Sequence, residues 1–498
     1  MKSFFVLLFL FIFFAAASAQ DRIVSQKLDA YLTARTALGR FSGAVLVAKG
    51  DEIILRRGYG FADVEERVPF TPETKQMAAS ITKMFTAMAV LKLGEKGRLR
   101  LDDPVCKYIP NCPDAWKPVA IDDLVHHVSG IPDYEERLEM GSKEYFEFMT
   151  GENTSARIIE DARGRPLDFA PREKFKYSNT GYVILGSIVE TVSKTTLGRF
   201  VEKNLLKPAG MKSSGFYDNS RPPENLAYGY TYGDIGWEKT VGGFSLTGGL
   251  LKKEPRLTLS SPAGDGGLYS TVDDLLRWSR AMDEKPPVSR EDVARVFTPG
   301  KGAYGGGWFI YNEFDRKKYR HNGILPGHVS EFIKFPGDKL TIIILSNLDR
   351  IRLSNIARDV TAIVLGQPYD MPVSGTVIKL DEKQIAALEG DYKTVDGKTL
   401  NVRNEPDYLT GRMTDAKGGL EFIAGWIPVS PTEFYFPFRD GKVIFTLDEN
   451  GKAVKVNLRY RGEDHFAERI TGARAAPPAL SAKREYLPLK GAKVLRRN

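Results

Sequence analysis

A change in sequence pattern around residues 367–382 divides the chain into two parts that cannot share one fold. Before it, residues 20–366 alternate apolar, β-branched runs, such as 43–47 and 340–345, with amphipathic stretches. The strand-like runs come early and late, and the helical stretches lie between them. This order predicts an α+β (α/β layered) domain whose sheet is completed by both ends of the segment. Residues 367–382 themselves are predicted to be a linker.

The second part, residues 383–472, has the pattern of short strands joined by tight turns. Asp396-Gly397, Asp440-Gly441 and Asn450-Gly451 are all dipeptides typical of hairpins. Apolar and polar residues alternate from Val454 to Tyr460, as in a strand with one buried face. About ninety residues of this kind predict a small antiparallel β-barrel or sandwich.

The first nineteen residues have the layout of a secretory signal peptide. Lys2 provides a positive start, residues 4–14 are an unbroken apolar run, and Ala17-Ser18-Ala19 is a small-x-small cleavage site. The apolar run is short for a membrane span, which needs about 20 residues. We therefore expect cleavage after Ala19 and a protein that is periplasmic or secreted.

The two cysteines limit the chemistry of the chain. Cys106 and Cys112 are six positions apart in a turn-rich stretch, and a bridge between them would stabilise the fold by about 2 kcal/mol. Two independent buried thiols are the alternative. Two cysteines exclude a zinc site that needs three or four thiolate ligands, and none of the 5 histidines falls in a His-Glu-x-x-His pattern. We expect no metal and no cofactor.

The basic charge of the chain is concentrated in its last residues. The formal net charge is +8, but residues 473–498, which contain Pro477-Pro478 and no periodic pattern, hold seven basic residues against one acidic residue. Lys2 carries one further charge, so residues 20–472 are nearly neutral. This distribution gives no support to a nucleic-acid partner. It predicts a flexible basic tail capable of weak association with anionic envelope polymers or lipid.

Ser80 and Lys83 are the first candidate catalytic residues. They stand three positions apart at the start of a stretch whose apolar residues recur at helical spacing, so they share one helix face. A serine hydroxyl becomes a good nucleophile only when a base removes its proton, and a buried lysine can be that base. Ser80 is the only serine with a lysine three residues later. A helix-capping serine followed by a surface lysine is the alternative.

Two later segments add polar candidates. Tyr177 and Asn179 precede an amphipathic run, where a tyrosine can relay protons and an asparagine can bind a substrate amide. Tyr217 begins a second Tyr-x-Asn pattern, so Tyr177 is preferred for its setting in a loop before a helix. His321 and Gly323 end a predicted strand, where a glycine allows close approach of a substrate backbone. His321 could hold a substrate carboxylate or support the tyrosine.

Together these segments resemble the serine β-lactamase and penicillin-binding-protein superfamily, in its class C-like, peptidase S12 and esterase branch. The resemblance covers about residues 25–365 and includes the flanking stretches 97–105, 124–132, 262–271 and 304–308. It implies an antiparallel sheet flanked by helices, with a helical subdomain. It further implies the following roles: Ser80 as acylated nucleophile, Lys83 as base, Tyr177 in proton transfer, Asn179 on the substrate amide, and the N–H groups of Ser80 and Ile324 as oxyanion hole.

His321 is where this chain departs from the resemblance. Many members have a charged lysine at that position, whereas an unperturbed histidine is mostly neutral at pH 7. We therefore expect an exported serine hydrolase of D-residue peptides or of small esters and amides. A β-lactamase and a catalytically silent protein that binds peptidoglycan fragments are the alternatives. Residues 383–472 resemble the lipocalin-like module attached to some of these hydrolases.

Overall fold

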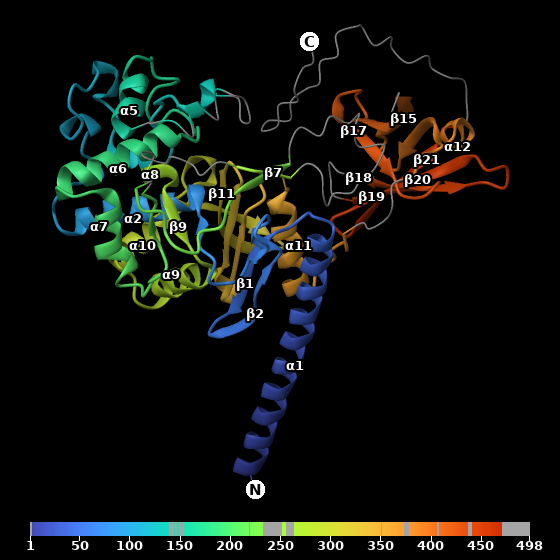
Figure 1. The fold of residues 1–498 in the computed structure, drawn as a ribbon, viewed down its shortest axis with the longest axis horizontal. Helices are drawn as coiled ribbons and strands as arrows, with labels where there is room; N and C mark the ends of the chain where they lie inside the picture. Colours follow the sequence, from blue (N-terminus) through green and yellow to red (C-terminus); the bar gives the residue numbers. More distant parts are fainter. Residues whose placement is uncertain are drawn as a thin grey trace. The chain divides into compact units, whose positions relative to one another are not determined.

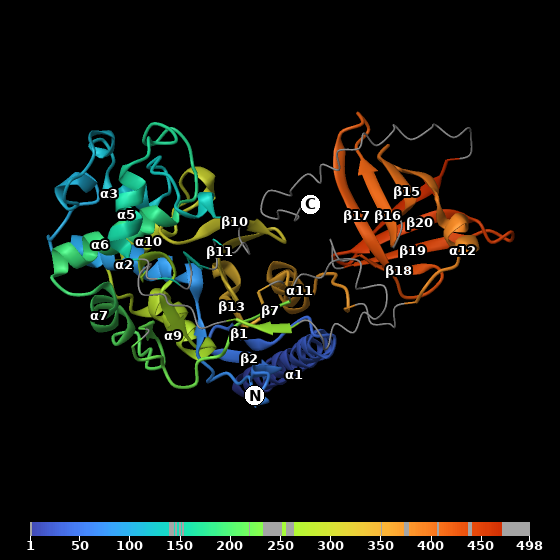
Figure 2. The ribbon, with the colours of Figure 1, turned by 45° about the horizontal axis from the view of Figure 1, so that its top comes forward.

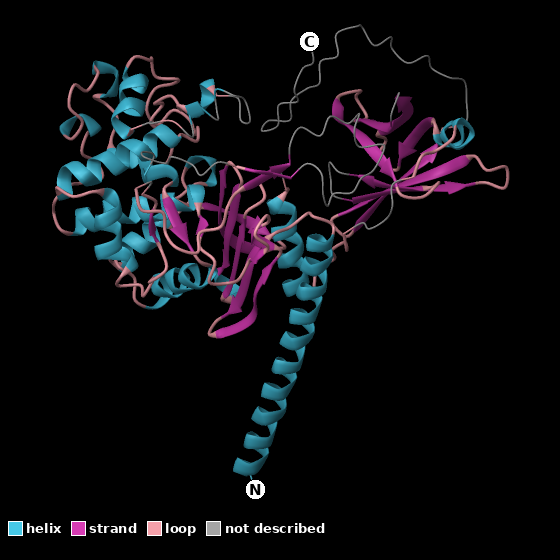
Figure 3. Ribbon diagram, viewed as in Figure 1, coloured by secondary structure: helices cyan, strands magenta, loops and turns pink. Residues whose placement is uncertain are grey.

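The chain forms two compact units that divide between Met371 and Pro372, and each is described here by itself. The first unit mixes helices and strands, whereas the second is almost entirely strands (Figures 1 and 3). The computed structural model describes residues 2–138, 144, 147–148, 151, 154–218, 220–232, 251–254, 263–349, 351–372, 378–405, 408–436 and 441–470.

A six-stranded antiparallel sheet forms the centre of the first unit, in the order β10-β11-β12-β13-β1-β2. The early and late strands meet where β1 pairs with β13, with Val45 opposite Ile344. The prediction that both ends of the segment complete one sheet is confirmed. The strands are β1 (Gly43–Lys49), β2 (Glu52–Tyr59), β10 (Phe309–Glu313), β11 (Arg316–Leu325), β12 (His328–Phe335) and β13 (Leu340–Ser346).

Both faces of the central strands are buried, because alternate side chains enter two different cores. Val45 and Ile344 pack against helices α1 (Lys2–Ala37) and α11 (Leu353–Leu365). Leu46 and Ile343, one position along each strand, belong to the larger core on the opposite face. A strand buried on both sides needs a continuous apolar sequence, which β1 and β13 have. Figure 2 shows α1 and α11 beside these strands.

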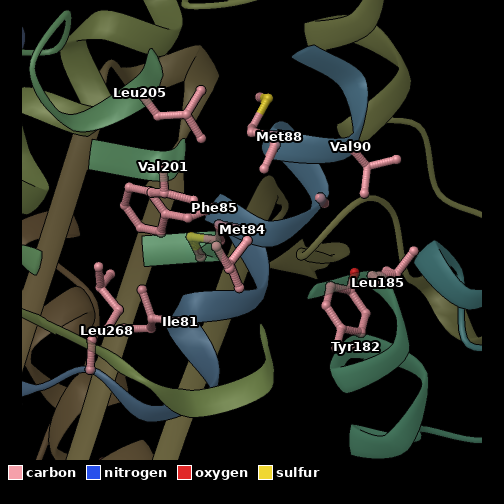
Figure 4. Close-up of a cluster of buried hydrophobic side chains, with 14 of the residues drawn as sticks. Ile81, Met84, Phe85, Met88, Val90, Tyr182, Leu185, Val201, Leu205 and Leu268 are labelled. Carbon is pink, nitrogen blue, oxygen red and sulfur yellow. The ribbon is translucent and has the colours of Figure 1, made fainter. Parts of the chain in front are cut away.

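The larger core surrounds helix α2 (Thr82–Glu95), which lies within the helical layers. Its side chains are buried almost all round, and Phe85 stacks on Trp278 with ring centroids 4.4 Å apart. Figure 4 shows Met84, Phe85 and Met88 of α2 among side chains of neighbouring helices. The helices of the first unit also include α3 (Ile121–Val125), α5 (Ser155–Arg163), α6 (Asn179–Ser193), α7 (Leu197–Val201), α8 (Ala263–Gly266), α9 (Val272–Glu284), α10 (Arg290–Val296) and the π-helix Glu202–Leu206.

Short strands and one disulfide complete the first unit. Cys106 and Cys112 are joined by a disulfide and pack against the larger core. In the described part of this unit, three small sheets contain β3 (Phe61–Asp63) with β4 (Val68–Pro69), β7 (Tyr230–Tyr232) with β8 (Leu251–Lys253), and β9 (Leu268–Ser270) between β5 (Gln76–Met77) and β6 (Gly215–Phe216).

The second unit is a closed antiparallel β-barrel, as the hairpin pattern predicts. Its interior is filled by buried aromatic side chains, including Tyr392, Trp426, Phe434 and Phe445, and the short helix α12 (Glu382–Leu388) packs Leu388 against them. The strands are β14 (Gly390–Thr394), β15 (Thr399–Glu405), β16 (Tyr408–Thr414), β17 (Leu420–Pro428), β18 (Glu433–Phe436), β19 (Gly441–Leu447), β20 (Ala453–Tyr460) and β21 (Glu463–Arg469).

The two ends of the chain leave two predictions open. Residues 2–19 belong to helix α1, and neither cleavage after Ala19 nor export is tested by that helix. Among the described residues, no helix combines the length and the hydropathy of a membrane span. The predicted basic tail, residues 473–498, and residues 373–377 of the predicted linker lie outside the described residues.

Candidate active site

Ser80 stands at the entrance to helix α2. It lies in a 3-10 turn, Ala79–Ile81, that continues directly into the helix. Ala79 has a left-handed backbone with φ 50°, a conformation that costs about 1–2 kcal/mol in a residue with a side chain. Lys83 follows one turn later, and its Nζ lies 3.0 Å from the Oγ of Ser80. The predicted pair is therefore in hydrogen-bond contact.

Lys83 is fully buried, and three oxygens surround its amino group. Besides Ser80, Nζ donates to Oδ1 of Asn179 at 2.7 Å and to the backbone carbonyl of Asp265 at 2.9 Å. Burial lowers the pKa of Lys83, because an ammonium ion loses its hydration there. Nearby carboxyl groups oppose this effect. A lysine with a lowered pKa is available as a base nearer to neutral pH.

A cluster of carboxyl groups lies behind Lys83. Asp133, Glu135 and Asp265 all act electrostatically on the lysine, and the Tyr134 hydroxyl donates to Oδ2 of Asp265 at 2.8 Å. Burial raises the pKa of Asp265 to about 6 and that of Glu135 to about 8. Oδ1 of Asp265 has no hydrogen-bond partner among the described residues. The ionisation of this cluster therefore influences the proton on Lys83.

Tyr177 lies in the loop immediately before α6, as predicted. The side chain of Ser178 caps the helix by accepting the N–H of Gly181, and this cap fixes the end of the loop. The Nζ of Lys83 lies 5.0 Å from the centre of the Tyr177 ring, which places the phenol beside the Ser80–Lys83 pair. Burial raises the pKa of Tyr177 well above its usual value, so the phenol keeps its proton at neutral pH. Tyr217 instead packs beside Met77 and Ala79, and Asn219 lies outside the described residues.

Asn179 is anchored by the protein at both ends of its amide. Oδ1 accepts from Lys83, while Nδ2 donates to Oδ2 of Asp133 at 3.2 Å. The backbone N–H of Asn179 donates to the same carboxylate oxygen at 2.8 Å. An amide group has two N–H donors, so one donor of Nδ2 remains for a substrate. Asn179 therefore orients the lysine in addition to any contact with substrate.

His321 is buried and electrically neutral. Its Nδ1 lies 2.7 Å from the backbone oxygen of Asn322, and its Nε2 lies 3.1 Å from the Tyr304 hydroxyl. Burial lowers the pKa of His321 to about 3, and the charge of Lys83 adds to this effect. The ring is neutral, and both of its nitrogens have protein partners. The geometry therefore favours packing of His321 against the aromatic cluster of Tyr177, Tyr304 and Phe309 over binding of a substrate carboxylate.

Gly323 brings strand β11 against the nucleophile turn. A Cβ at this position would lie 2.4 Å from the backbone oxygen of Ala78 and 2.8 Å from Cβ of Ala79. The close approach that requires glycine is therefore to the protein's own backbone, whereas the sequence suggested approach by a substrate. Ile324 follows and is 47% exposed. Strand β10 pairs with β11 only up to Arg320, so the edge beside Ser80 has no strand neighbour among the described residues.

The fold thus gathers most of the predicted site around one serine. Hydrogen bonds link Lys83 to Ser80 and to Asn179, and the Tyr177 ring lies 5.0 Å from the Lys83 Nζ. The ring of His321 lies 6.1 Å from that of Tyr177. The sequence patterns assign no role to the acidic cluster, to His127 or to Tyr304. Each lies within or beside one of the flanking stretches that resemble the family, and this position is the sequence feature by which these residues could be found. No group of His, Cys, Asp or Glu side chains in the described ranges is arranged to hold a metal ion.

Comparisons with known proteins agree with this geometry. The family model described as Beta-lactamase matches residues 22–364. Penicillin-binding protein 4* of Bacillus subtilis (strain 168) is 30% identical over 432 residues, which cover 82% of this chain and 91% of that protein.

Two solved structures share the fold. The octameric penicillin-binding protein homologue from Pyrococcus abyssi has a TM-score of 0.62 and 26% identity, and the match covers 89% of this chain and 99% of that chain. D-amino acid amidase from Ochrobactrum anthropi SV3, complexed with L-phenylalanine, has a TM-score of 0.58 and 20% identity, over 68% of this chain and 97% of that one. The second likeness concerns the fold alone.

Proposed function

The chain belongs to the beta-lactamase family and is a serine hydrolase, and we propose that it is an exported enzyme that cleaves amide or ester bonds through an acyl-enzyme on Ser80. One observation carries this proposal: the Oγ of Ser80 lies 3.0 Å from the buried amino group of Lys83. Neither a helix cap nor a surface lysine would need that contact, and burial of the lysine favours its neutral, basic form.

In the first step, Lys83 removes the proton of Ser80 as Oγ attacks the carbonyl carbon of the substrate. The phenol of Tyr177 then donates its proton to the leaving nitrogen or oxygen as the bond to carbon breaks. Lys83 returns a proton to Tyr177, so the proton that Ser80 lost is balanced by the one that the leaving group gained. The raised pKa of Tyr177 suits a group that must be protonated before it donates.

The negative oxygen of the tetrahedral intermediate is assigned to the N–H groups of Ser80 and Ile324. Ser80 is at the start of α2, where the first N–H groups of the helix lack partners within the helix and favour a nearby negative charge. Ile324 is on the unpaired edge of β11, beside the turn that contains Ser80. In the second step, water attacks the acyl carbon and Lys83 accepts a proton from it. As the bond from carbon to the Ser80 Oγ breaks, Lys83 returns that proton to Oγ, and the carboxylic acid product leaves.

The proposed substrates are D-residue peptides or small esters and amides. The neutral state of His321 supports this choice, because a charged group that could hold the carboxylate of a β-lactam is missing at this position. The apolar run and small-x-small site in residues 1–19 support export.

The proposal is tested by labelling with a fluorophosphonate probe, followed by mass spectrometry of the peptide that contains Ser80. Ser80→Ala should lose the adduct and lower kcat by a factor of about 10³ or more, whereas the exposed Ser220→Ala should change neither. Turnover is then compared on p-nitrophenyl esters, D-amino-acid amides, D-Ala-D-Ala peptides and nitrocefin, and we expect nitrocefin to be the poorest. An unlabelled Ser80, with activity that survives Ser80→Ala, would disprove the catalytic assignment.

A further inference from the structure

His127 holds the two residues on either side of Tyr177. The backbone carbonyl of His127 accepts the N–H of Lys176 at 3.0 Å, and its ring Nδ1 accepts the N–H of Ser178 at 3.1 Å. The imidazole itself stacks on the Tyr177 ring, with centroids 4.3 Å apart and planes inclined by 34°. Tyr177 is therefore held through both chain neighbours and on one face of its ring by a single residue.

The hydrogen bond from Ser178 defines the protonation state of His127. An imidazole that accepts at Nδ1 carries its proton on Nε2 and is neutral. The side chain is 1% exposed, and burial lowers its pKa well below the usual value. Nε2 has no hydrogen-bond partner among the described residues, and the rings of Tyr304 and Tyr182 lie 4.5 Å and 5.0 Å from the imidazole. Protonation of Nδ1 would remove the acceptor that Ser178 uses.

The backbone of His127 is strained in a way that serves these contacts. Its φ is 55°, in the left-handed region, directly after helix α3 ends. Such a conformation costs about 1–2 kcal/mol in a residue with a side chain, and it persists only where the surroundings impose it. The next residue, Val128, accepts the N–H of Arg172 at 2.7 Å. The strained turn is thus bonded to both ends of the segment 172–178 that carries Tyr177.

We propose that His127 is a positioning residue of this hydrolase, which holds the phenol of Tyr177 against Ser80 without contacting the substrate. The proposal rests on the proton-transfer role given to Tyr177 above and deepens it. It explains why a neutral histidine is buried next to a catalytic lysine, where a cation would be repelled. It also accounts for a histidine among the rings of Tyr177, Tyr182 and Tyr304, since packing alone would not require one there.

The test is a double-mutant cycle between His127 and Tyr177. His127→Phe keeps a ring but removes the acceptor, whereas His127→Asn keeps an acceptor and tolerates a left-handed backbone. We expect His127→Phe to lower kcat on a p-nitrophenyl ester by about tenfold, with little change in KM, and His127→Asn to recover part of that loss. In a Tyr177→Phe background, His127→Phe should cause no further loss, because the group that it positions is gone.

His126→Asn is the matched control, since His126 is the adjacent histidine and its Nδ1 lies 3.0 Å from the backbone oxygen of Asp122. It should keep wild-type kcat. Losses that multiply in the double variant, or a fall in kcat that simply follows a fall in Tm, would show a merely structural role and overturn the inference. If His127→Phe does not fold, His127→Asn in the same cycle decides. Wild-type rates in Ser80→Ala and Tyr177→Phe would instead contradict the proposed function itself.

Discussion

A lysine that acts as a base must lose its proton within the working pH range of the enzyme, and the charges around Lys83 decide where that occurs. Burial lowers its pKa, and the carboxylate of Asp265 is the largest influence in the opposite direction. The Lys83 amino group bonds to the backbone carbonyl of Asp265, so substitution of the side chain leaves this contact in place. The electrostatic effect can therefore be separated from the hydrogen bond.

We predict that Asp265→Asn moves the acidic limb of the kcat/KM profile to lower pH. Removing the carboxylate lowers the pKa of Lys83 further, so the neutral amine is present at a lower pH. The shift should be on the order of one pH unit. It should be visible above about pH 6, where the carboxyl group of the unmodified protein is ionised. The measurement is the pH dependence of ester hydrolysis.

Glu160→Gln is the control for this prediction, because Glu160 is an exposed residue of α5 that pairs with Arg163. Its pH profile should match that of the unmodified protein. An acidic limb that stays in place or moves to higher pH in Asp265→Asn would mean that Lys83 is not the group whose ionisation limits the reaction.

At the scale of single residues, the sequence predicts contacts between residues that are close along the chain. It does not predict contacts between residues that are far apart along the chain. Ser80 and Lys83 were recognisable because residues three apart share a helix face, and the structure brings them into contact. The roles of His127 and Asp265 depend on contacts with residues about 50 and 180 positions away, to Ser178 and Lys83. The spacing of residues in the sequence does not predict contacts over such separations. The only sequence signal for His127 and Asp265 is that they lie in stretches that resemble the family.

Strand β11 joins the sheet to the nucleophile turn, and it can approach that turn because residue 323 is glycine. A methyl group there would overlap the backbone of Ala78 and the side chains of Ala79 and Ser330. Since one of these obstacles is backbone, the strand or the turn must move. Either movement separates the N–H groups of Ser80 and Ile324.

We predict that Gly323→Ala lowers kcat by about tenfold or more, because a displaced oxyanion donor stabilises the transition state less well. The measurement is kcat on a p-nitrophenyl ester together with Tm. Gly337→Ala, in the turn between β12 and β13, is the control, because a Cβ there meets nothing within 4 Å. If Gly323→Ala keeps wild-type kcat, the edge of β11 does not provide the oxyanion hole.

Elements with a local signal were predicted better than elements placed by their surroundings. Gly397 and Gly451 have φ values of 83° and 77° at the β14–β15 and β19–β20 turns, as the hairpin dipeptides indicate. The apolar residues of α2 recur at the spacing typical of a helix with one buried face, yet the helix is buried nearly all round because α6, α7 and α8 pack against it. Helix α12 was missed, since seven residues within a strand-like region give no clear periodicity.

Each of the two units contains its own hydrophobic core. The aromatic core of the barrel draws only on residues of the C-terminal unit, and the two cores on the faces of the sheet draw only on the first unit. Closure of the barrel is reinforced where Arg469 on β21 donates to the backbone oxygens of Ala387 and Glu389 near the end of α12. The proposed chemistry needs only residues of the first unit.

We therefore predict that the two units unfold in separate transitions and that barrel damage spares catalysis. Phe434 in the barrel and Phe332 in the sheet are both fully buried, so each change to alanine should cost about 3–5 kcal/mol. Phe434→Ala should lower only the barrel transition in calorimetry and leave ester hydrolysis unchanged. Phe332, which packs on Trp308 and lies opposite His321, should lower the other transition and also the hydrolysis rate when changed to alanine.

Val395→Ala provides the control, because this barrel residue is fully exposed and its loss should alter neither transition. A single transition that shifts in both core variants would show that the barrel and the catalytic unit are energetically coupled. Loss of hydrolysis in Phe434→Ala, with the catalytic transition still in place, would show that the barrel contributes to the site. Either result would replace the view of the barrel as an independently folded attachment with one in which it regulates or completes the enzyme.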